Sequence, residues 1–206
     1  MEAVHLIRYA LGVAAIAFAG PTLLFLLRPS VIRAWFEAGP EGIGKAASPA
    51  ALGLIAVLRE LGFEALGVKA EKTPLRPIVR ELAFVAADRQ CYASVAARPP
   101  GTRFYYYTPL AAGGFVLTSN SAFPKIASAT VVQQSHLGGD PRALLERHHE
   151  TLAKLGQRGE VIASDQARLD ATCAYYADPA VRAAMRRTGL FLLVWVALLG
   201  WLLLRP

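Results

Sequence analysis

Residues 79–119 read VRELAFVAADRQCYASVAARPPGTRFYYYTPLAAGGFVLTS. The stretch consists of apolar runs of strand length, rich in valine and aromatic residues, that are separated by turn-like breaks. These breaks are Asp88–Gln90, Arg98–Gly101 and Ala111–Gly113. Because such short breaks join neighbouring antiparallel strands, the stretch predicts a β-meander.

The same strand pattern continues on both sides of this stretch and predicts an antiparallel meander of about five or six strands. The predicted strands are Phe63–Lys72, Val79–Ala87, Cys91–Ala97, Thr102–Pro109, Gly114–Ser119 and Ala127–Gln134. Alternate residues of a strand point to opposite faces, so the aromatic run 104–107 places rings on both faces of the sheet. We expect helices to cover one face and a partner, the membrane or solvent to meet the other.

Helices are predicted before and after the sheet, so the fold class is α+β. Three of them begin with a capping residue followed by proline, which suits the first turn of a helix. The fourth is expected to be capped by Ser164. The predicted helices are Pro49–Leu61, Pro141–Leu155, Asp165–Tyr176 and Pro179–Leu204.

Two uncharged apolar blocks, one near each end of the chain, predict two transmembrane helices. The first is Tyr9–Leu27, and at about 1.5 Å per residue it reaches about 28 Å, close to the ~30 Å thickness of a bilayer core. The second, Gly189–Leu204, is shorter, but arginines at both of its ends can extend to the headgroups. The chain is therefore expected to be a membrane-anchored α+β domain.

A cleaved signal peptide is the alternative interpretation of the first block. Ala17-Phe18-Ala19 has the small-x-small pattern of a cleavage site. Against this alternative, the apolar run resumes at Leu23 and continues to Leu27, and Glu2 lies in the segment that would carry the positive charge.

Basic residues near the two blocks predict the orientation of the domain. The flanks on the domain side contain Arg28, Arg33, Lys45, Arg182, Arg186 and Arg187. The outer flanks contain only Arg8, Arg205 and the amino terminus. We therefore expect an integral membrane protein, with the domain in the cytoplasm and both termini outside.

The expected organisation along the chain follows from these elements. A short tail, 1–8, precedes the first span at 9–27, and the second span lies at 189–204. The α+β domain occupies 48–187. The juxtamembrane segment and loop between them, 28–47, includes Pro29–Ala38, which we predict to be an amphipathic helix along the headgroups or a cap on the domain core.

Composition favours a membrane interpretation over a nucleic-acid one. The formal net charge is +7 and 54% of residues are hydrophobic. Much of the basic charge lies beside the apolar blocks, where membrane lipids explain it and a nucleic-acid partner is not needed. The expected membrane-surface residues are Arg28, Arg33, Trp35, Arg182, Arg186 and Arg187. Abundant alanine, and arginine in excess over lysine, point to a GC-rich bacterial genome, hence a bacterial inner membrane.

No motif in the sequence predicts a catalytic residue, a metal site or a cofactor. Cys91 and Cys173 form no CxxC pair and are expected to be small buried residues. The adjacent His148 and His149 lack the i,i+4 spacing of a helical metal pair, and His148 falls in line with the leucines of its helix. An enzyme would need these residues to converge in one cleft: His136, His148 or His149 with Glu146, Glu150 or Asp140.

The leading functional hypothesis is a non-catalytic, membrane-tethered interaction module or accessory subunit that docks a membrane-protein partner or a second copy of itself. Small residues such as Gly12 and Ala19 in the first span would let another helix approach closely. The alternative is a binding module for a lipid or other apolar ligand in a pocket between sheet and helices. The residues predicted to line that pocket are Phe84, Phe104, Tyr106 and Phe115.

Overall fold

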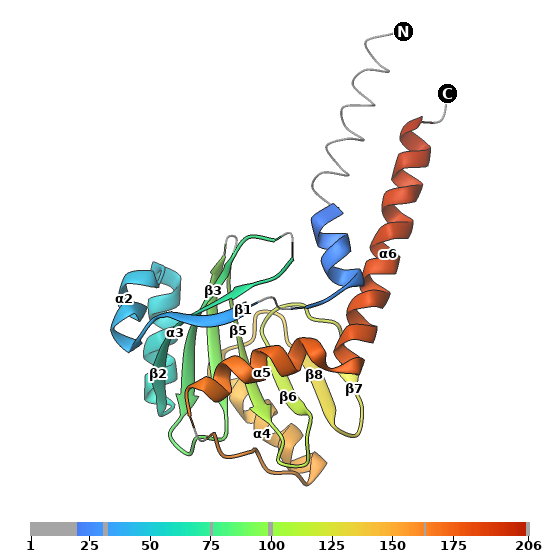
Figure 1. Cartoon of the computed structure of the whole chain (residues 1–206). Coiled ribbons are helices and arrows are strands. Elements are labelled where there is room, and N and C mark those ends of the chain that lie inside the picture. Colours follow the sequence, from blue (N-terminus) through green and yellow to red (C-terminus); the bar gives the residue numbers. More distant parts are fainter. Residues whose placement is uncertain (1–19, 31–32, 75, 99–100, 163, 205–206) are drawn as a thin grey trace.

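The computed structural model describes residues 20–30, 33–74, 76–98, 101–162 and 164–204. The predicted α+β class is confirmed, since a mostly antiparallel eight-stranded sheet carries helices on both faces (Figure 1). The sheet runs in the order β1-β2-β3-β4-β5-β6-β8-β7. The strands are β1 Arg33–Ala38, β2 Phe63–Lys72, β3 Val79–Ala86, β4 Tyr92–Arg98, β5 Gly101–Pro109, β6 Phe115–Ser119, β7 Ile126–Ala127 and β8 Val131–Ser135.

The meander from β2 to β6 matches the prediction, because each of these strands pairs antiparallel with the next one in the chain. The chain beyond β6 differs from it. The predicted strand Ala127–Gln134 is two strands, and β8 pairs parallel with β6 while β7 folds back on its far side. After Ser119 the chain first forms β7 at the edge of the sheet and then returns as β8, which lies between β6 and β7.

The interpretation of Pro29–Ala38 as an amphipathic helix is wrong. Arg33–Ala38 is the edge strand β1, paired antiparallel with β2 so that Trp35 lies opposite Ala70. The aromatic pair Trp35-Phe36 suits a strand as well as a helix face, and the unpaired edge of β2 offers backbone hydrogen bonds that a surface helix could not use.

The helices begin and end close to where their capping residues predict. The Ser48 hydroxyl accepts from the backbone N–H of Ala51, and Asp140 and Asp178 cap their helices in the same way. Gly156 closes one helix with a left-handed φ of 63°. The helices are η1 Pro40–Gly42, α2 Ile43–Ala46, α3 Pro49–Glu60, α4 Pro141–Leu155, α5 Gln166–Ala177 and α6 Pro179–Leu204. The predicted cap Ser164 is displaced by Asp165, whose side chain makes no capping bond.

The sheet separates two apolar cores (Figure 1). Helices α3 and α4 cover one face, where Leu58 and Leu144 pack against Phe84 and Tyr106. On the other face, α5 and the first turns of α6 cover a core that includes Tyr107. The prediction that rings occupy both faces of β5 is therefore confirmed. The expectation that a partner, the membrane or solvent meets one face is wrong, because helices cover both faces.

One helix among the described residues, Pro179–Leu202, is long and apolar enough to cross a membrane. Its upper part exposes large apolar side chains, including Phe191, Val194 and Leu198. Of the first predicted span, residues 20–27 are described and are helical. The remainder, with Gly12 and Ala19, lies outside the described residues.

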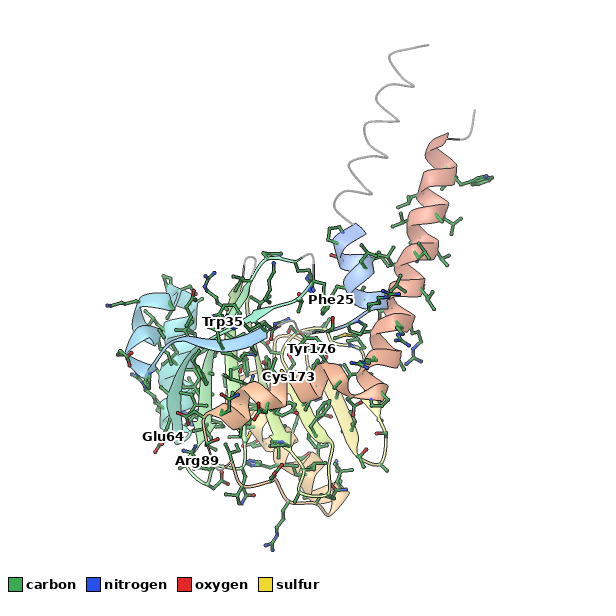
Figure 2. All side chains as sticks on the ribbon, in the orientation of Figure 1. Phe25, Trp35, Glu64, Arg89, Cys173 and Tyr176 are labelled. Atoms are coloured by element: carbon green, nitrogen blue, oxygen red, sulfur yellow. The ribbon has the colours of Figure 1, made fainter. Side chains whose placement is uncertain are left out.

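The helical residues 20–27 lie beside α6 and contact the domain (Figures 1 and 2). A Cβ at Gly189 would lie 2.9 Å from Cβ of Leu26, so the two helices approach closely at this glycine. The ring of Phe25 packs edge-on against Tyr176 of α5, with the ring centroids 5.8 Å apart.

The turn before β6 provides a test of the parallel β6–β8 pairing. Gly113 and Gly114 have φ of 88° and 86°, but only at Gly114 would a Cβ clash with the Thr130 backbone. Gly113→Ala should cost about 1 kcal/mol for the left-handed backbone alone. Gly114→Ala should cost several times more, or prevent folding, measured as thermal or urea midpoints. Equal midpoints would show that Thr130 does not lie against this turn.

Candidate functional site

His148 lies in the core. It is fully buried on the side of α4 that faces the sheet. Its Nε2 lies 2.9 Å from the hydroxyl oxygen of Thr108, and its Nδ1 lies 3.0 Å from that of Thr118. Burial lowers its pKa to about 3, with a further contribution from the neighbouring charge of His149. Both nitrogens are occupied, so this histidine is a packed, neutral core residue.

The residues of the hypothetical enzyme site do not converge. His149, Glu146 and Glu150 are exposed on α4 while His148 faces the sheet. Asp140 caps α4, and Arg147 donates to Nδ1 of His136. No group of His, Cys, Asp and Glu suited to a metal ion occurs among the described residues.

The four residues predicted to line an apolar pocket lie on two faces of the sheet. Phe84, Phe104 and Tyr106 share the core under α3 and α4. Phe115 belongs to the opposite core, where it stacks on Tyr107 with centroids 5.1 Å apart. The β5–β6 register pairs Pro109 with Phe115, which puts Phe115 on the face of the odd-numbered tyrosines.

The predicted membrane-surface residues divide into two groups. Cζ of the Arg33 guanidinium lies 5.3 Å from the centroid of the Trp35 ring, and both residues belong to β1. Arg182, Arg186 and Arg187 are exposed in the first turns of α6, near the exposed Arg28. Within this second group, Arg186 Nε donates to the carbonyl of Leu27 at 3.3 Å, which ties the two helices together where α6 becomes apolar.

The prediction that both cysteines are buried is correct for one and wrong for the other. Cys91 is buried as expected, but Cys173 is exposed on α5. Figure 2 shows it one turn of the helix before Tyr176. The prediction fails at Cys173 because α5 buries only one of its sides against the sheet.

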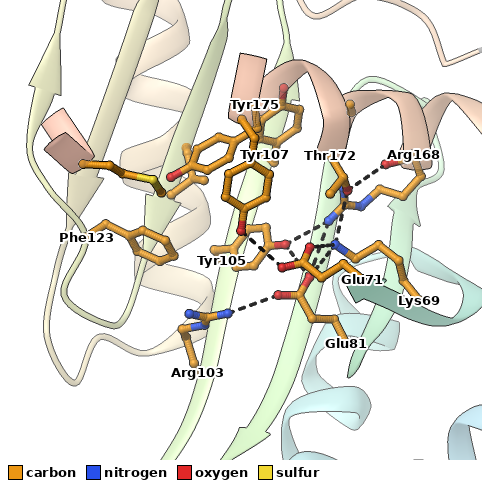
Figure 3. Close-up of a pocket in the computed structure, with 14 residues that line it drawn as sticks. Lys69, Glu71, Glu81, Arg103, Tyr105, Tyr107, Phe123, Arg168, Thr172 and Tyr175 are labelled. Atoms are coloured by element: carbon orange, nitrogen blue, oxygen red, sulfur yellow. Dashed lines mark hydrogen bonds and ion pairs between the residues drawn. The ribbon is translucent and has the colours of Figure 1, made fainter. Parts of the chain in front are cut away.

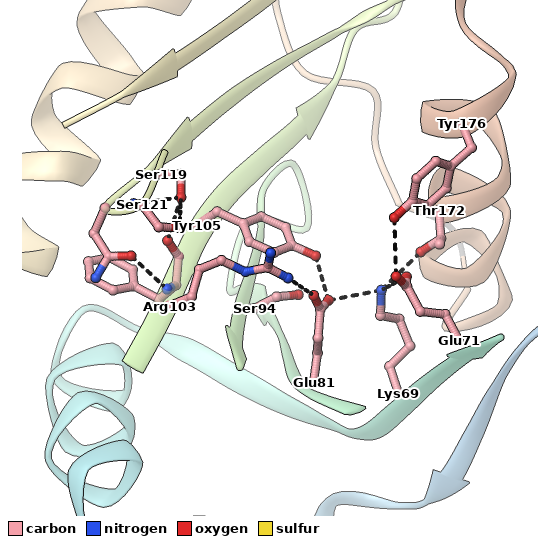
Figure 4. A network of polar contacts seen from close by, with 12 residues as sticks. Lys69, Glu71, Glu81, Ser94, Arg103, Tyr105, Ser119, Ser121, Thr172 and Tyr176 are labelled. Atoms are coloured by element: carbon pink, nitrogen blue, oxygen red, sulfur yellow. Dashed lines mark hydrogen bonds and ion pairs between the residues drawn. The ribbon is translucent and has the colours of Figure 1, made fainter. Parts of the chain in front are cut away.

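The chemically most unusual feature is a buried cluster of charges between α5 and the sheet (Figures 3 and 4). Lys69, Glu81 and Arg168 are only 1%, 2% and 3% exposed. Lys69 and Glu71 alternate along β2 and so share a face, and the register of β2 with β3 places Glu81 directly opposite Lys69. Arg103 and Tyr105 join them from β5.

Lys69 and Glu81 form the centre of this cluster. Lys69 Nζ lies 2.9 Å from Oε2 of Glu81 and 3.2 Å from Oε2 of Glu71, and it donates to the Thr172 hydroxyl at 3.2 Å. Glu81 also accepts a hydrogen bond of 2.5 Å from the Tyr105 hydroxyl and one of 3.2 Å from Arg103. The ammonium group of Lys69 thus donates to one carboxylate and one hydroxyl and forms an ion pair with a second carboxylate.

Arg168 reaches the cluster from α5. Its guanidinium donates to the hydroxyl oxygens of Thr172, Ser94 and Tyr105 at 3.0, 2.9 and 2.9 Å. The same group lies 5.2 Å from the centroid of the Tyr92 ring. Its Nε–H is buried and has no acceptor among the described residues, and the same holds for Nε–H of Arg103.

The charges in the cluster keep one another ionised. Burial alone raises the pKa of Glu81, but the charges of Lys69 and the two arginines outweigh burial and hold this pKa well below its ordinary range. Burial alone lowers the pKa of Lys69, but Glu81, Tyr105 and Glu71 together outweigh burial, so the net shift of this pKa is upward. Three cationic and two anionic side chains leave the cluster with a net positive charge.

A cavity of about 70 Å³ adjoins these charges (Figure 3). Aromatic rings form much of its remaining wall, and Met185 of α6 closes one side. Arg103, with 30% of its side chain exposed, and the half-buried Phe123 and Tyr176 are the lining residues nearest to solvent. The lining residues that carry the argument are Lys69, Glu81, Arg103, Tyr105, Arg168 and Tyr176.

This cluster is the candidate site, and the sequence analysis did not find it. The available signal was charge inside the predicted strands, at Lys69, Glu71 and Glu81. In an antiparallel sheet such residues normally mark the solvent face, so they predict a polar surface and not a buried site. Only the position of α5 shows that this face is covered.

Comparisons with known proteins gave no match. No protein-family model matches the chain, and no curated protein and no solved structure is significantly similar to it.

The buried state of His148 predicts a dependence of stability on pH. The unfolded chain binds a proton at this position below a pKa of about 6.5, whereas the folded chain does not until about pH 3, so stability decreases as pH falls through this window. Between pH 6 and 5 the contribution is about 1.4 kcal/mol per pH unit. His148→Gln should reduce the pH slope of the unfolding free energy by about that amount.

Urea unfolding in mild detergent measures the slope. The control is His149→Gln, which removes an exposed imidazole from the same helix. The buried neutral state of His148 would be contradicted if both variants retained the slope of the unmodified protein.

Proposed function

We propose that this protein is a membrane-anchored, non-catalytic binding module whose pocket between α5 and the sheet takes a small ligand. The supporting observation is the buried charge cluster beside the cavity. Burying charges carries a desolvation penalty of several kcal/mol per ion, and apolar side chains in their place are often as stable or more so. Such a cluster is therefore better explained by ligand recognition than by stability.

The directions of the pKa shifts favour binding over acid–base catalysis. A general acid or base works best with a pKa near the working pH. Here the pKa of Glu81 is lowered and those of Lys69 and Tyr105 are raised, so all three move away from neutrality. These groups hold fixed charges and dipoles, as a binding site requires.

Anchoring by two transmembrane helices is part of the proposal. Asp178 ends α5 and caps α6, so the helix that covers the pocket leads directly into the apolar one. Residues 20–27 pack beside α6, which supports Tyr9–Leu27 as a second span in a bacterial inner membrane. Arg182, Arg186 and Arg187 lie in the first turns of α6. Basic side chains beside a span favour the cytoplasmic side, which would place the domain inside and both termini outside.

Docking of a membrane-protein partner, or of a second copy, is a second proposal. It is favoured by the apolar side chains that α6 exposes above Gly189, such as Leu190, Phe191 and Trp195. Lipid tails or another transmembrane helix would cover this surface. Purification in mild detergent followed by mass spectrometry separates these possibilities, since a partner helix co-purifies in fixed stoichiometry.

The exposed Cys173 reports the orientation of the domain directly. In bacterial spheroplasts, a membrane-impermeant maleimide should leave the protein unlabelled, and permeabilisation should allow labelling. Cys173→Ser provides the control for labelling at the buried Cys91. Labelling of Cys173 in intact spheroplasts would place the domain on the outside and reverse the proposed topology.

Filling the cavity tests whether the pocket is the binding site. Ala171 lines it from α5, whereas Ala174 is exposed on the same helix. Native mass spectrometry of protein purified from its host should detect a bound small molecule. Ala171→Leu should lose that molecule through steric exclusion, while Ala174→Leu should retain it. A molecule that both variants hold equally would not occupy this pocket.

A further inference from the structure

We infer that the ligand of this pocket carries an oxoanion, either a carboxylate or a phosphate group, which the guanidinium groups of Arg103 and Arg168 bind. The inference rests on the proposed function and specifies the chemistry of the same site. It follows from the hydrogen-bond donors, the charge and the shape of the pocket.

The donors are two arginine N–H groups from different elements. Nε–H of Arg103 on β5 and Nε–H of Arg168 on α5 are both buried, and neither has an acceptor in the described chain. Both residues line the same cavity. A guanidinium presents its N–H groups in a planar fork that matches the two oxygens of a carboxylate or phosphate. A buried donor without an acceptor is unfavourable, so an oxoanion here gains more than it would at a solvated arginine.

The carboxylates of the cluster do not accept hydrogen bonds from these two Nε–H groups. Glu81 forms ion pairs with Lys69 and with the terminal nitrogen of Arg168, and it accepts from the Tyr105 hydroxyl and from the terminal nitrogen of Arg103. Glu71 accepts from Lys69 and from the Tyr176 hydroxyl at 3.2 Å. With both carboxylates engaged, one positive charge in the cluster remains without a counter-charge. A singly charged oxoanion neutralises it, whereas a cationic ligand is repelled.

The size of the cavity limits what can enter it. A volume of about 70 Å³ accommodates an anionic group of a few heavy atoms. The remainder of a larger ligand would extend past Phe123, which stacks beneath the guanidinium of Arg103 at 5.3 Å. The rings of the wall suit an apolar or planar group next to the anion.

A groove lies beside α6 and is separate from the pocket in its lining residues. Two of them, Pro124 and Ala184, are the sequence neighbours of Phe123 and Met185, which line the pocket. The groove is also lined by Phe191 in the apolar part of α6 and by two cations, Lys125 and Arg187. Neither of these cations forms an ion pair within the described residues. The oxoanion therefore has two possible sources: a free soluble anion, or the phosphodiester of an acidic lipid that enters along this groove.

The test compares anions with the full-length protein in nanodiscs of zwitterionic phosphatidylcholine. Inorganic phosphate, acetate and benzoate are titrated against chloride at equal ionic strength, with calorimetry and thermal unfolding as measurements. At least one oxoanion should bind and raise the unfolding midpoint. Arg103→Gln should weaken that binding roughly tenfold or more, because it removes a charged donor.

Two further variants separate recognition from folding. Arg103→Lys keeps the charge beside Glu81 but loses the fork of donors, so its binding should fall between that of the unmodified protein and Arg103→Gln. Arg142→Gln removes an exposed arginine on α4 that pairs with Glu60, and it should bind like the unmodified protein. Arg103 is partly exposed, so its variants should fold; an unchanged unfolding midpoint without ligand verifies this.

The lipid arm uses nanodiscs that contain phosphatidylglycerol. If the headgroup is the ligand, native mass spectrometry should retain this lipid on the unmodified protein, and Arg103→Gln should lose it. Lys125→Glu and Arg187→Glu should then reduce the retention of phosphatidylglycerol and leave the binding of soluble anions unchanged. Binding of phosphate or a carboxylate without lipid retention identifies a free anion as the ligand.

The inference is overturned if Arg103→Gln binds every anion as the unmodified protein does, if only neutral or cationic probes bind, or if only water occupies the pocket. Its failure is distinguishable from failure of the proposed function. A neutral ligand that Ala171→Leu excludes and Arg103→Gln retains would leave the binding module intact without an oxoanion. If no ligand is excluded by Ala171→Leu, the binding module itself is contradicted.

Discussion

The buried ion pair between Lys69 and Glu81 is the constraint on which the arrangement of the domain depends. It links β2 to β3, and Thr172 and Arg168 of α5 bond to Lys69 and to Tyr105 of this cluster. Burying these two charges is costly unless polar groups surround them, so α5 must lie where its polar side chains can reach the cluster. Because α6 follows α5 directly, the position of this long apolar helix relative to the sheet depends on the same contacts.

The two faces of the sheet consequently differ in chemistry. Under α3 and α4 the core is mostly apolar, and the buried imidazole of His148 is neutral and held between two threonines. Under α5 the tyrosines of β5 and the ring of Phe115 surround a charged centre. The first face packs apolar side chains, whose burial stabilises the fold. The second combines fixed charges, unpaired donors and a small cavity, which is the combination expected of a site that recognises a polar group.

The pocket lies next to the helix that is long and apolar enough to cross a membrane. Tyr176 contacts both the cluster and Phe25, and Met185 closes the cavity from the first turns of α6. A ligand in the pocket would thus touch both α5 and α6, the two consecutive helices that the proposed function assigns to binding and to anchoring.

Much of this structure was determined by the sequence alone, because the signals are local. Ser48, Asp140 and Asp178 mark where helices begin, the turn residues separate β2 to β6, and the apolar run of α6 marks its length. Interactions between distant segments decided the rest. Arg33–Ala38 is a strand because it pairs with the edge of β2. The chain after β6 crosses over so that β8 pairs with β6, and the β5–β6 register determines on which face Phe115 lies. The charge cluster belongs to this second group: Lys69 and Thr172 are 103 residues apart in the chain, and no local pattern shows that α5 covers the polar face of β2 and β3.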